Sequence, residues 1–184
     1  MKRLLDGLAA GAGLAVLSPV LLLVAAAIRL DSPGPVLFRQ TRIGLGGREF
    51  QILKFRSMVT DAATRGPFNT QENDPRITRV GRLIRKTSLD ELPQLWNVLV
   101  GDMSLVGPRP DVPAQRGLYT DDEWRERHLV RPGITGLAQA TLRSSGTEDQ
   151  RKALDLRYVR EISLVLDAKI LLMTVRQVLT RGGN

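Results

Sequence analysis

A long apolar segment begins the chain. Residues 7–28 contain no charged side chain and read GLAAGAGLAVLSPVLLLVAAAI. As a straight helix these 22 residues would be about 33 Å long, enough to cross a hydrocarbon core of about 30 Å. The segment is long for a signal peptide and is not followed by a small-residue cleavage site. The pattern predicts a membrane anchor over residues 1–30 and a globular domain over residues 31–184.

Ser18 and Pro19 lie in the middle of this anchor. Proline removes a helical hydrogen bond and clashes with the preceding turn, so we expect a kink or break there, with Ser18 bonding a carbonyl that the proline leaves free. Basic residues flank the segment on both sides, so the positive-inside rule gives no clear orientation. These observations leave two arrangements open, a spanning helix and a re-entrant helix-break-helix.

Alternating apolar and polar positions follow the anchor. Residues 31–58 are typical of two strands joined by a glycine-rich turn at residues 44–47, and the turn has no phosphate-loop spacing. Lys54 shares a strand face with Phe50 and Ile52. A lysine on such a face either extends to the edge of the sheet or meets an acidic group or a phosphate.

Helical periodicity dominates the rest of the chain. Residues 77–87 have apolar side chains on one side and arginines mostly on the other, which fits a helix on anionic lipid or an ordinary solvated helix. Residues 147–179 predict two helices that meet near residue 162. The second of these has an apolar stripe, expected to pack on the domain or on lipid, formed by Ala168, Leu171, Leu172, Val175 and Leu179.

The segment SLDELPQLWN, residues 88–97, places two adjacent carboxylates, Asp90 and Glu91, in a basic chain. Ser88 with Glu91 three positions later fits a capping box, and Asp90 would then lie in the first helical turn. Capping alone would account for both acids. However, Arg85 precedes them, and the rigid loops VGPRP and RPGITG each carry one arginine, Arg109 and Arg131, in a setting that suits phosphate recognition.

Composition narrows the chemistry. The net charge is +8, and five lysines among 27 basic residues leave 22 arginines, so an anionic partner is expected: nucleic acid, phospholipid or a phosphorylated small molecule. Aromatic residues make up only 4% of the chain, which disfavours a nucleic-acid binder. Cysteine is absent, and His128 lies in a charged stretch that indicates a solvated side chain. Any metal would therefore have mainly oxygen ligands, as Mg²⁺ prefers.

These motifs resemble the monotopic phosphoglycosyl transferases, the bacterial sugar transferase family, in its minimal catalytic form. The resemblance covers nearly the whole chain in the family's order. The matching segments are KRLLD (2–6), Ser18-Pro19, LKFRSM (53–58), RKTSLDELPQLWNVLVGDMSLVGPRP (85–110), RPGITGLAQ (131–139) and LDLRYVREISLVLDAKILLMTV (154–175).

The resemblance implies a fold and an activity. The fold would be a helix-rich α+β domain with a short β-hairpin, amphipathic interfacial helices and a re-entrant N-terminal helix, monotopic on the cytoplasmic face of the bacterial inner membrane. The activity would be Mg²⁺-dependent transfer of a sugar 1-phosphate from a UDP-sugar to a polyprenol phosphate, with release of UMP.

The resemblance also implies roles for individual residues. Asp90 would be the nucleophile and approach the metal, and Glu91 would assist it. Placement at a helix N-terminus is expected to keep Asp90 ionised. Substrate would be bound by Lys54, Arg85, Arg109, Arg131 and Asp155, of which Asp155 also fits a surface salt bridge with Arg151.

The sequence departs from the family pattern in one region. Arg157 and the pair Glu161-Ile162 depart from the family pattern, which affects substrate detail rather than the reaction.

The alternative function is a non-catalytic, membrane-anchored basic module that binds anionic lipid or glycan. That alternative explains the charge and the anchor but does not explain two carboxylates beside rigid arginine loops.

Overall fold

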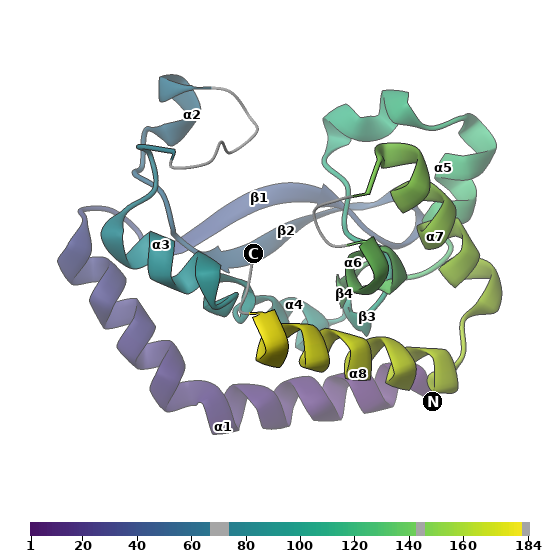
Figure 1. Cartoon of the computed structure of the whole chain (residues 1–184), viewed down its shortest axis with the longest axis horizontal. Coiled ribbons are helices and arrows are strands. Elements are labelled where there is room, and N and C mark those ends of the chain that lie inside the picture. The colour runs from purple at the N-terminus through teal and green to yellow at the C-terminus, as the bar shows by residue number, and fades with distance from the viewer. Residues whose placement is uncertain (67–73, 143–145, 182–184) are drawn as a thin grey trace.

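The computed structural model describes residues 1–66, 74–142 and 146–181, and shows a helix-rich α+β fold (Figure 1). The α-helices are α1 (Lys2–Asp31), α2 (Ala62–Arg65), α3 (Arg79–Lys86), α4 (Gln94–Val100), α5 (Asp121–Arg127), α6 (Leu137–Leu142), α7 (Glu148–Glu161) and α8 (Leu164–Arg181). The strands are β1 (Leu37–Ile43), β2 (Glu49–Phe55), β3 (Ser104–Val106) and β4 (Gly133–Thr135). Three short 3-10 helices are η1 (Leu45–Gly47), η2 (Leu89–Glu91) and η3 (Pro113–Leu118).

Helix α1 continues through Pro19 and changes direction near its middle (Figure 1). Pro19 has no N–H to donate to the carbonyl of Ala15, and the Ser18 hydroxyl donates to that oxygen instead, at 2.8 Å. The predicted serine bond is therefore confirmed. Because only one helical bond is lost and its acceptor is satisfied, the element is one kinked helix rather than two helices separated by a break.

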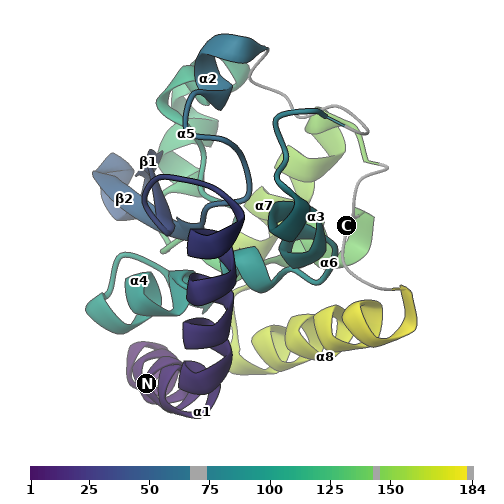
Figure 2. The ribbon, with the colours of Figure 1, turned by 90° about the vertical axis from the view of Figure 1, so that its left-hand side faces the viewer.

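Three helices form the lower layer of the molecule. Figure 2 shows α4 and α8 on either side of α1, with the strands and the remaining helices above them. Leu95 and Leu99 of α4 pack against the cluster that contains the buried Ala10 of α1. The second half of α1 packs on α3 and the hairpin through Val24, Ile28, Phe55 and Ile84. Helix α1 thus packs along one side of the domain over most of its length.

Polar contacts attach both ends of α1 to the domain. At the N-terminal end, Lys2 donates to Asp167 of α8 at 2.6 Å, and Asp6 accepts from the hydroxyl of Ser104 at 2.8 Å. At the C-terminal end, the buried Arg56 donates to the carbonyls of Ser32 and Pro33, at 2.7 and 2.6 Å. The two ends of the apolar helix therefore meet the same globular body.

The predicted hairpin is confirmed. Strands β1 and β2 pair antiparallel from Leu37 opposite Phe55 to Ile43 opposite Glu49. The turn uses Gly46 and Gly47 at φ of 66° and 77°, the left-handed region that favours glycine. The segment after the hairpin contains the short helix α2 (Ala62–Arg65), and residues 67–73 lie outside the described part of the chain.

The boundary between the two C-terminal helices is confirmed, and one of the two alternatives for the apolar stripe of α8 is excluded. Helices α7 and α8 meet at residues 162–163, as expected. The apolar stripe of α8 does not pack on the domain, because Ala168, Leu171, Leu172 and Val175 are exposed while Ile170 is buried. The side chain of Leu179 lies outside the described residues.

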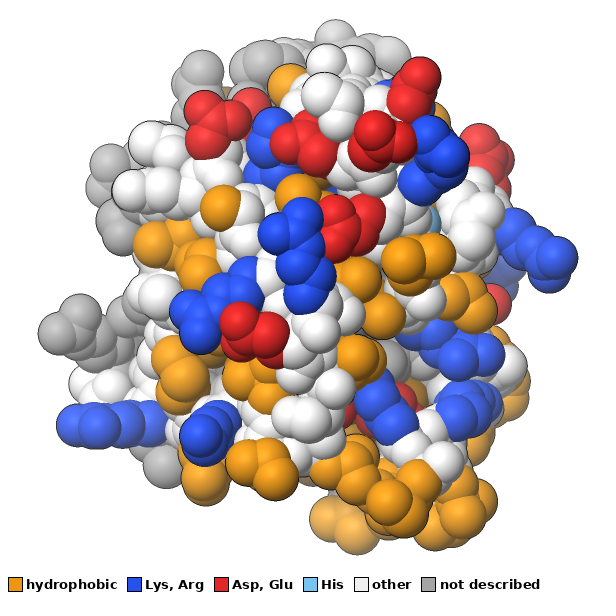
Figure 3. All heavy atoms as spheres, turned by 90° about the vertical axis from the view of Figure 1, so that its right-hand side faces the viewer, with side chains coloured by type: hydrophobic (Ala, Val, Ile, Leu, Met, Phe, Trp, Pro, Cys, Tyr) orange, Lys and Arg blue, Asp and Glu red, His pale blue; other side chains and the backbone are white. Residues whose placement is uncertain are grey.

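Apolar side chains gather along the lower edge of the molecule in Figure 3, below a zone of charged groups. Exposed members of the lower layer include Leu22 and Leu23 of α1, Trp96 of α4, and Val165 and Leu172 of α8. Helix α1 is also long and apolar enough to cross a membrane by length and composition. The lower layer is thus the apolar face of the described molecule.

Candidate active site

Glu91 is the centre of an ion cluster above helix α4. The Lys54 ammonium on β2 lies 2.5 Å from Glu91 Oε1, and the Arg109 guanidinium lies 3.8 Å from the same oxygen. Of the two possibilities for Lys54, the structure shows that it meets an acidic group. Burial alone would raise the pKa of Glu91, but Lys54 and Arg109 more than offset this and hold the pKa below its ordinary value.

The capping-box interpretation of the acidic pair is wrong. Ser88 has a left-handed backbone, with φ of 56°, and its side chain makes no cap bond. Residues 89–91 form η2, and α4 begins only at Gln94 with Pro93 at the cap position. Glu91 therefore turns toward Lys54 of another element rather than back to Ser88.

Asp90 and Glu91 have different environments. Burial and the adjacent charge of Glu91 raise the pKa of Asp90, and Lys54 and Arg85 only partly offset this. A helix terminus was expected to favour the charged form of Asp90, but η2 is a single short turn, and desolvation is the largest influence on the pKa. Among the described residues, no side-chain hydrogen bond or salt bridge holds the Asp90 carboxylate. Asp90 thus has a raised pKa and no side-chain anchor, whereas Glu91 has a lowered pKa and is anchored by Lys54.

The two proline- and glycine-rich loops lie against each other. Strand β3 pairs in parallel with β4, and Gly107 N–H donates to the Thr135 carbonyl at 2.9 Å. A Cβ added to Gly133 would lie 2.1 Å from the nitrogen of Gly107, so the close approach requires glycine. This contact fixes the backbone from which Arg109 projects toward Glu91.

Arg127 fixes the same loop from the other side. Its guanidinium is buried between Asp111 and Asp155, with Nε 2.6 Å from Asp111, and also donates to the Arg109 carbonyl at 2.8 Å. The surface pair of Asp155 with Arg151 is therefore wrong, because Asp155 is buried and bonds Arg127. His128 is also buried rather than solvated, with Nδ1 2.7 Å from the Trp124 carbonyl.

The remaining predicted residues differ in their placement. Arg85 lines the same cavity as Asp90 and Lys54. Arg131 donates to the Gly101 carbonyl at 2.8 Å and does not line the cavities described below, so a substrate role for it stays a prediction.

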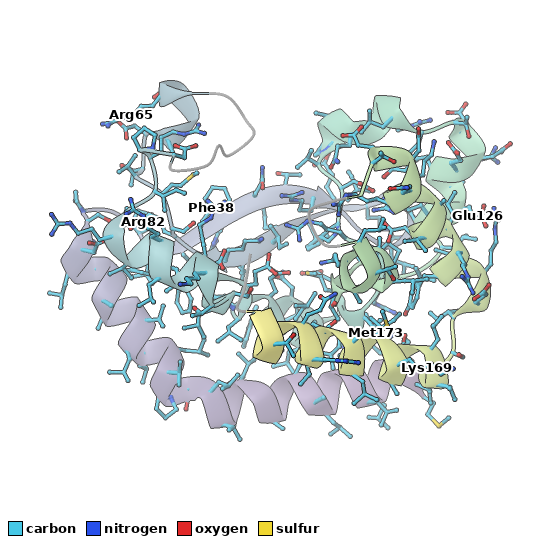
Figure 4. The ribbon with its side chains drawn as sticks, in the orientation of Figure 1. Phe38, Arg65, Arg82, Glu126, Lys169 and Met173 are labelled. Atoms are coloured by element: carbon cyan, nitrogen blue, oxygen red, sulfur yellow. The ribbon has the colours of Figure 1, made fainter. Side chains whose placement is uncertain are left out.

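Two cavities meet at this cluster. The first, here called the hairpin cavity, has a volume of about 730 Å³ and is lined by residues that include Leu37, Phe38, Lys54, Phe55, Arg85 and Asp90. Figure 4 shows Phe38 on the end of β1 that lies near α3. The second, here called the η3–α7 cavity, has a volume of about 610 Å³ and is lined by residues that include Arg42, Arg109, Leu118, Tyr119, Gln139 and Lys152. Both volumes are in the range typical of small-molecule sites.

Arg42 lines both cavities and was missed in the sequence. It donates to the Pro110 carbonyl at 3.0 Å and to Gln40 at 2.8 Å. Burial and the neighbouring Arg109 charge lower its pKa to about 10, so it remains cationic at neutral pH. In the sequence, the only indication of its position was that Arg42 follows Gln40 by two residues on a predicted strand, so the two side chains share one face.

Asp90 could take part in a magnesium site. Within the described residues, no group of three or more acidic or histidine side chains gathers to hold a metal. Mg²⁺ usually binds through one or two carboxylates together with water and substrate phosphate oxygens, rather than through an all-protein cage. Asp90, as a carboxylate that lines the hairpin cavity, fits that mode of binding once a substrate diphosphate supplies the other oxygens.

A carboxylate pair beside fixed cations, with one member anchored and the other free of side-chain bonds among the described residues, is the kind of site found in enzymes that act on phosphorylated substrates. The chain belongs to the bacterial sugar transferase family, whose family model matches residues 1–181.

The chain aligns with curated relatives over almost its whole length. It is 51% identical to a UDP-glucose:undecaprenyl-phosphate glucose-1-phosphate transferase of Caulobacter vibrioides, over 97% of this chain and 70% of that protein. It is 47% identical to the exopolysaccharide production protein PSS of Rhizobium leguminosarum bv. phaseoli, over 99% of this chain and 96% of that protein. A third relative, the UDP-N-acetylgalactosamine-undecaprenyl-phosphate N-acetylgalactosaminephosphotransferase of Aeromonas hydrophila, is 45% identical over 100% of this chain and 44% of its own length.

Proposed function

We propose that this protein transfers a sugar 1-phosphate from a UDP-sugar to undecaprenyl phosphate and releases UMP. The carrying observation is the division of the carboxylate pair, in which Lys54 holds Glu91 while Asp90 lines the hairpin cavity. The family and the printed activities of its relatives supply the reaction class.

Asp90 acts as the nucleophile in this proposal. One of its carboxylate oxygens attacks the sugar-bearing phosphorus, forming an O–P bond while the bond to the bridging oxygen breaks. UMP leaves with that oxygen. A phosphate oxygen of undecaprenyl phosphate then attacks the same phosphorus and restores the free Asp90 carboxylate. The raised pKa of Asp90 favours this role, because a more basic carboxylate donates its electrons more readily.

Fixed cations assist both steps. Arg109 and Arg42 face the region beside Glu91, where they would neutralise the diphosphate and stabilise charge on the leaving phosphate. Glu91 positions Lys54 and Arg109 through the ion cluster rather than reacting itself. Mg²⁺, held by Asp90 and substrate phosphates, would supply further positive charge on the diphosphate.

The lower layer supports a monotopic arrangement on the cytoplasmic face of the bacterial inner membrane. Both ends of α1 bond to the same globular body, so a helix crossing the bilayer would have to break one set of these contacts. A re-entrant α1 keeps both sets and places the exposed apolar side chains of α1, α4 and α8 in lipid. Undecaprenyl phosphate, itself a lipid, would then reach the site from the same layer.

UMP release tests the proposed activity. Purified protein in nanodiscs, given Mg²⁺, undecaprenyl phosphate and a panel of UDP-sugars, should release UMP with at least one sugar. Without acceptor it should release one equivalent of UMP and gain the mass of one sugar phosphate. Asp90→Asn should abolish both signals, whereas Asp122→Asn, an exposed acid on α5, should retain them.

Different results would point to the alternative function. Lipid binding without UMP release from any UDP-sugar would favour a non-catalytic, membrane-anchored basic module. Multiple turnover by Asp90→Asn, with deamidation excluded by mass, would overturn the role of Asp90 while leaving the transferase activity in place.

A further inference from the structure

We infer that the η3–α7 cavity binds the uridine of the nucleotide, a position that neither the family nor the printed activities of its relatives assign. The inference rests on the proposed function, because it takes a UDP-sugar as the donor. It starts from the order of groups between the two cavities: Asp90 lines the hairpin cavity, Arg109 lines the η3–α7 cavity, and Arg42 lines both.

The geometry of displacement at phosphorus then selects the cavity. In phosphoryl transfer, the attacking and leaving oxygens lie roughly in line on opposite sides of the phosphorus. Asp90 attacks from the hairpin side, so the leaving UMP extends away from that side, past Arg42 and Arg109. The space that opens there, among the described residues, is the η3–α7 cavity.

The walls of this cavity match a nucleoside monophosphate. Its lining includes the guanidiniums of Arg109 and of Arg42, which also lines the hairpin cavity, and these suit phosphate oxygens. Its lining also includes the half-buried ring of Tyr119 and the exposed apolar side chain of Leu118, surfaces against which a pyrimidine can pack, together with the amide of Gln139. Tyr119 is held in place by its hydroxyl bond to Asp111 and by ring contact with Trp124. The Arg127 guanidinium and the Lys152 ammonium also lie near its ring, 5.4 and 6.0 Å from the centroid. The cavity therefore offers a fixed aromatic ring among cationic groups.

Helix η3 provides matched positions for a test. Ala114 and Leu118 are exposed and line the cavity, so a tryptophan at either position would occupy the space assigned to uridine. Gly117 lies between them, is exposed, does not line the cavity, and a Cβ added there meets no atom within 4 Å. Gly117→Trp thus adds the same side chain to the same helix without filling the cavity.

Binding of UMP to the purified full chain, measured by calorimetry with Mg²⁺ present and no sugar donor, tests the inference without requiring turnover. The wild type should bind UMP at least about tenfold more tightly than ribose 5-phosphate, because the base contacts the cavity. Ala114→Trp and Leu118→Trp should lower UMP affinity about tenfold or more and remove its advantage over ribose 5-phosphate. Gly117→Trp should retain wild-type affinities for both.

The outcomes separate this inference from the proposed function. Equal binding of UMP and ribose 5-phosphate by the wild type would overturn the uridine assignment, as would wild-type UMP affinity in a folded Ala114→Trp or Leu118→Trp variant. An equal loss of affinity in Gly117→Trp would also overturn it. The proposed function fails on a different measurement, the absence of UMP release from every UDP-sugar, even where UMP itself binds as expected.

Discussion

The buried guanidinium of Arg127 donates a hydrogen bond to the backbone carbonyl of Arg109 at 2.8 Å. Arg109 itself projects toward Glu91, with 3.8 Å between its Nη2 and the carboxylate oxygen. One arginine thus fixes the backbone of another that faces the site. Because Arg127 of α5 also bonds Asp111 and Asp155, the proline-flanked loop, α5 and α7 are joined at a single side chain.

Replacing Arg127 should affect both stability and activity. Arg127→Met leaves two buried carboxylates without their cation, which should lower the free energy of unfolding by about 3–5 kcal/mol. Arg127→Lys keeps the charge but cannot make all three contacts, so UMP release should fall even at temperatures where the variant is folded. Thermal unfolding and the UMP assay measure the two effects. Arg160→Met removes an exposed pair with Glu126 and should change neither, and equal effects in both variants would contradict a special role for Arg127.

Arg109 should require its planar fork. Arg109→Lys keeps one positive charge but loses bidentate hydrogen bonding, and charge-assisted bonds contribute about 1.5–3 kcal/mol each. We therefore expect the rate of UMP release to fall about 10- to 100-fold. Arg125→Lys, at an exposed position on α5, is the matched control and should be neutral. A folded Arg109→Lys protein with normal kinetics would remove Arg109 from the site.

The contribution of the Lys54–Glu91 ion pair to folding stability should be separable from its contribution to activity. Lys54→Met leaves the half-buried Glu91 carboxylate without its 2.5 Å partner and should cost about 1–3 kcal/mol of folding free energy. Adding Glu91→Gln should recover much of that stability, because a neutral amide needs no counter-charge. UMP release should stay low in the double variant. Recovery of activity together with stability would show that the pair has only a structural role.

Local patterns in the sequence predicted local structure well. The hairpin of residues 37–55, the helix over residues 79–86 and the boundary between α7 and α8 all depend on neighbours in the chain, and their periodicity and turn residues are visible in the sequence. The pairing of Ser18 with the carbonyl left by Pro19 is similarly local.

Predictions failed where a distant residue provided a better partner. In a capping box the Glu91 carboxylate would accept a hydrogen bond from the Ser88 backbone. Instead it accepts a charge-assisted hydrogen bond from Lys54, which lies 37 positions away in the chain. Asp155 was expected to pair with Arg151 on one helix face, yet Arg127 reaches it from α5. His128 was read as solvated because its neighbours are charged, although one of them, Arg127, is itself buried with it. Such choices are decided by tertiary packing, which a linear pattern does not contain.

Gly81 should be intolerant of any side chain. A Cβ added there would lie 2.0 Å from the Ser57 carbonyl oxygen, so Gly81→Ala must displace α3 from the segment that follows β2. Overpacking of this kind costs about 1–3 kcal/mol. Chemical denaturation measures the loss. Gly117→Ala, where an added Cβ meets no atom within 4 Å, is the control, and equal stability of the two variants would mean that α3 does not approach Ser57 so closely.

The topology of α1 can be tested because the chain has no cysteine. A cysteine placed directly after Met1, Pro33→Cys beyond the other end of α1, and Arg48→Cys in the hairpin turn should all react with a membrane-impermeant maleimide from one side only, the cytoplasmic side. Arg48 marks the side of the catalytic domain. Labelling of the first position from the opposite side to the other two would contradict the re-entrant arrangement.

Pro19 provides the matching structural variant. Pro19→Ala restores the N–H that can donate to the Ala15 carbonyl, so the Ser18 bond to that oxygen is no longer needed and the helix can straighten. A straight α1 would strain the contacts of Lys2 with Asp167 at one end or of Arg56 with Ser32 at the other. We therefore expect Pro19→Ala to lower the melting temperature and to label a fraction of the N-terminal cysteines from the periplasmic side. Ser18→Ala, which removes only the hydroxyl, should keep the wild-type topology, because the missing N–H of Pro19 still produces the kink.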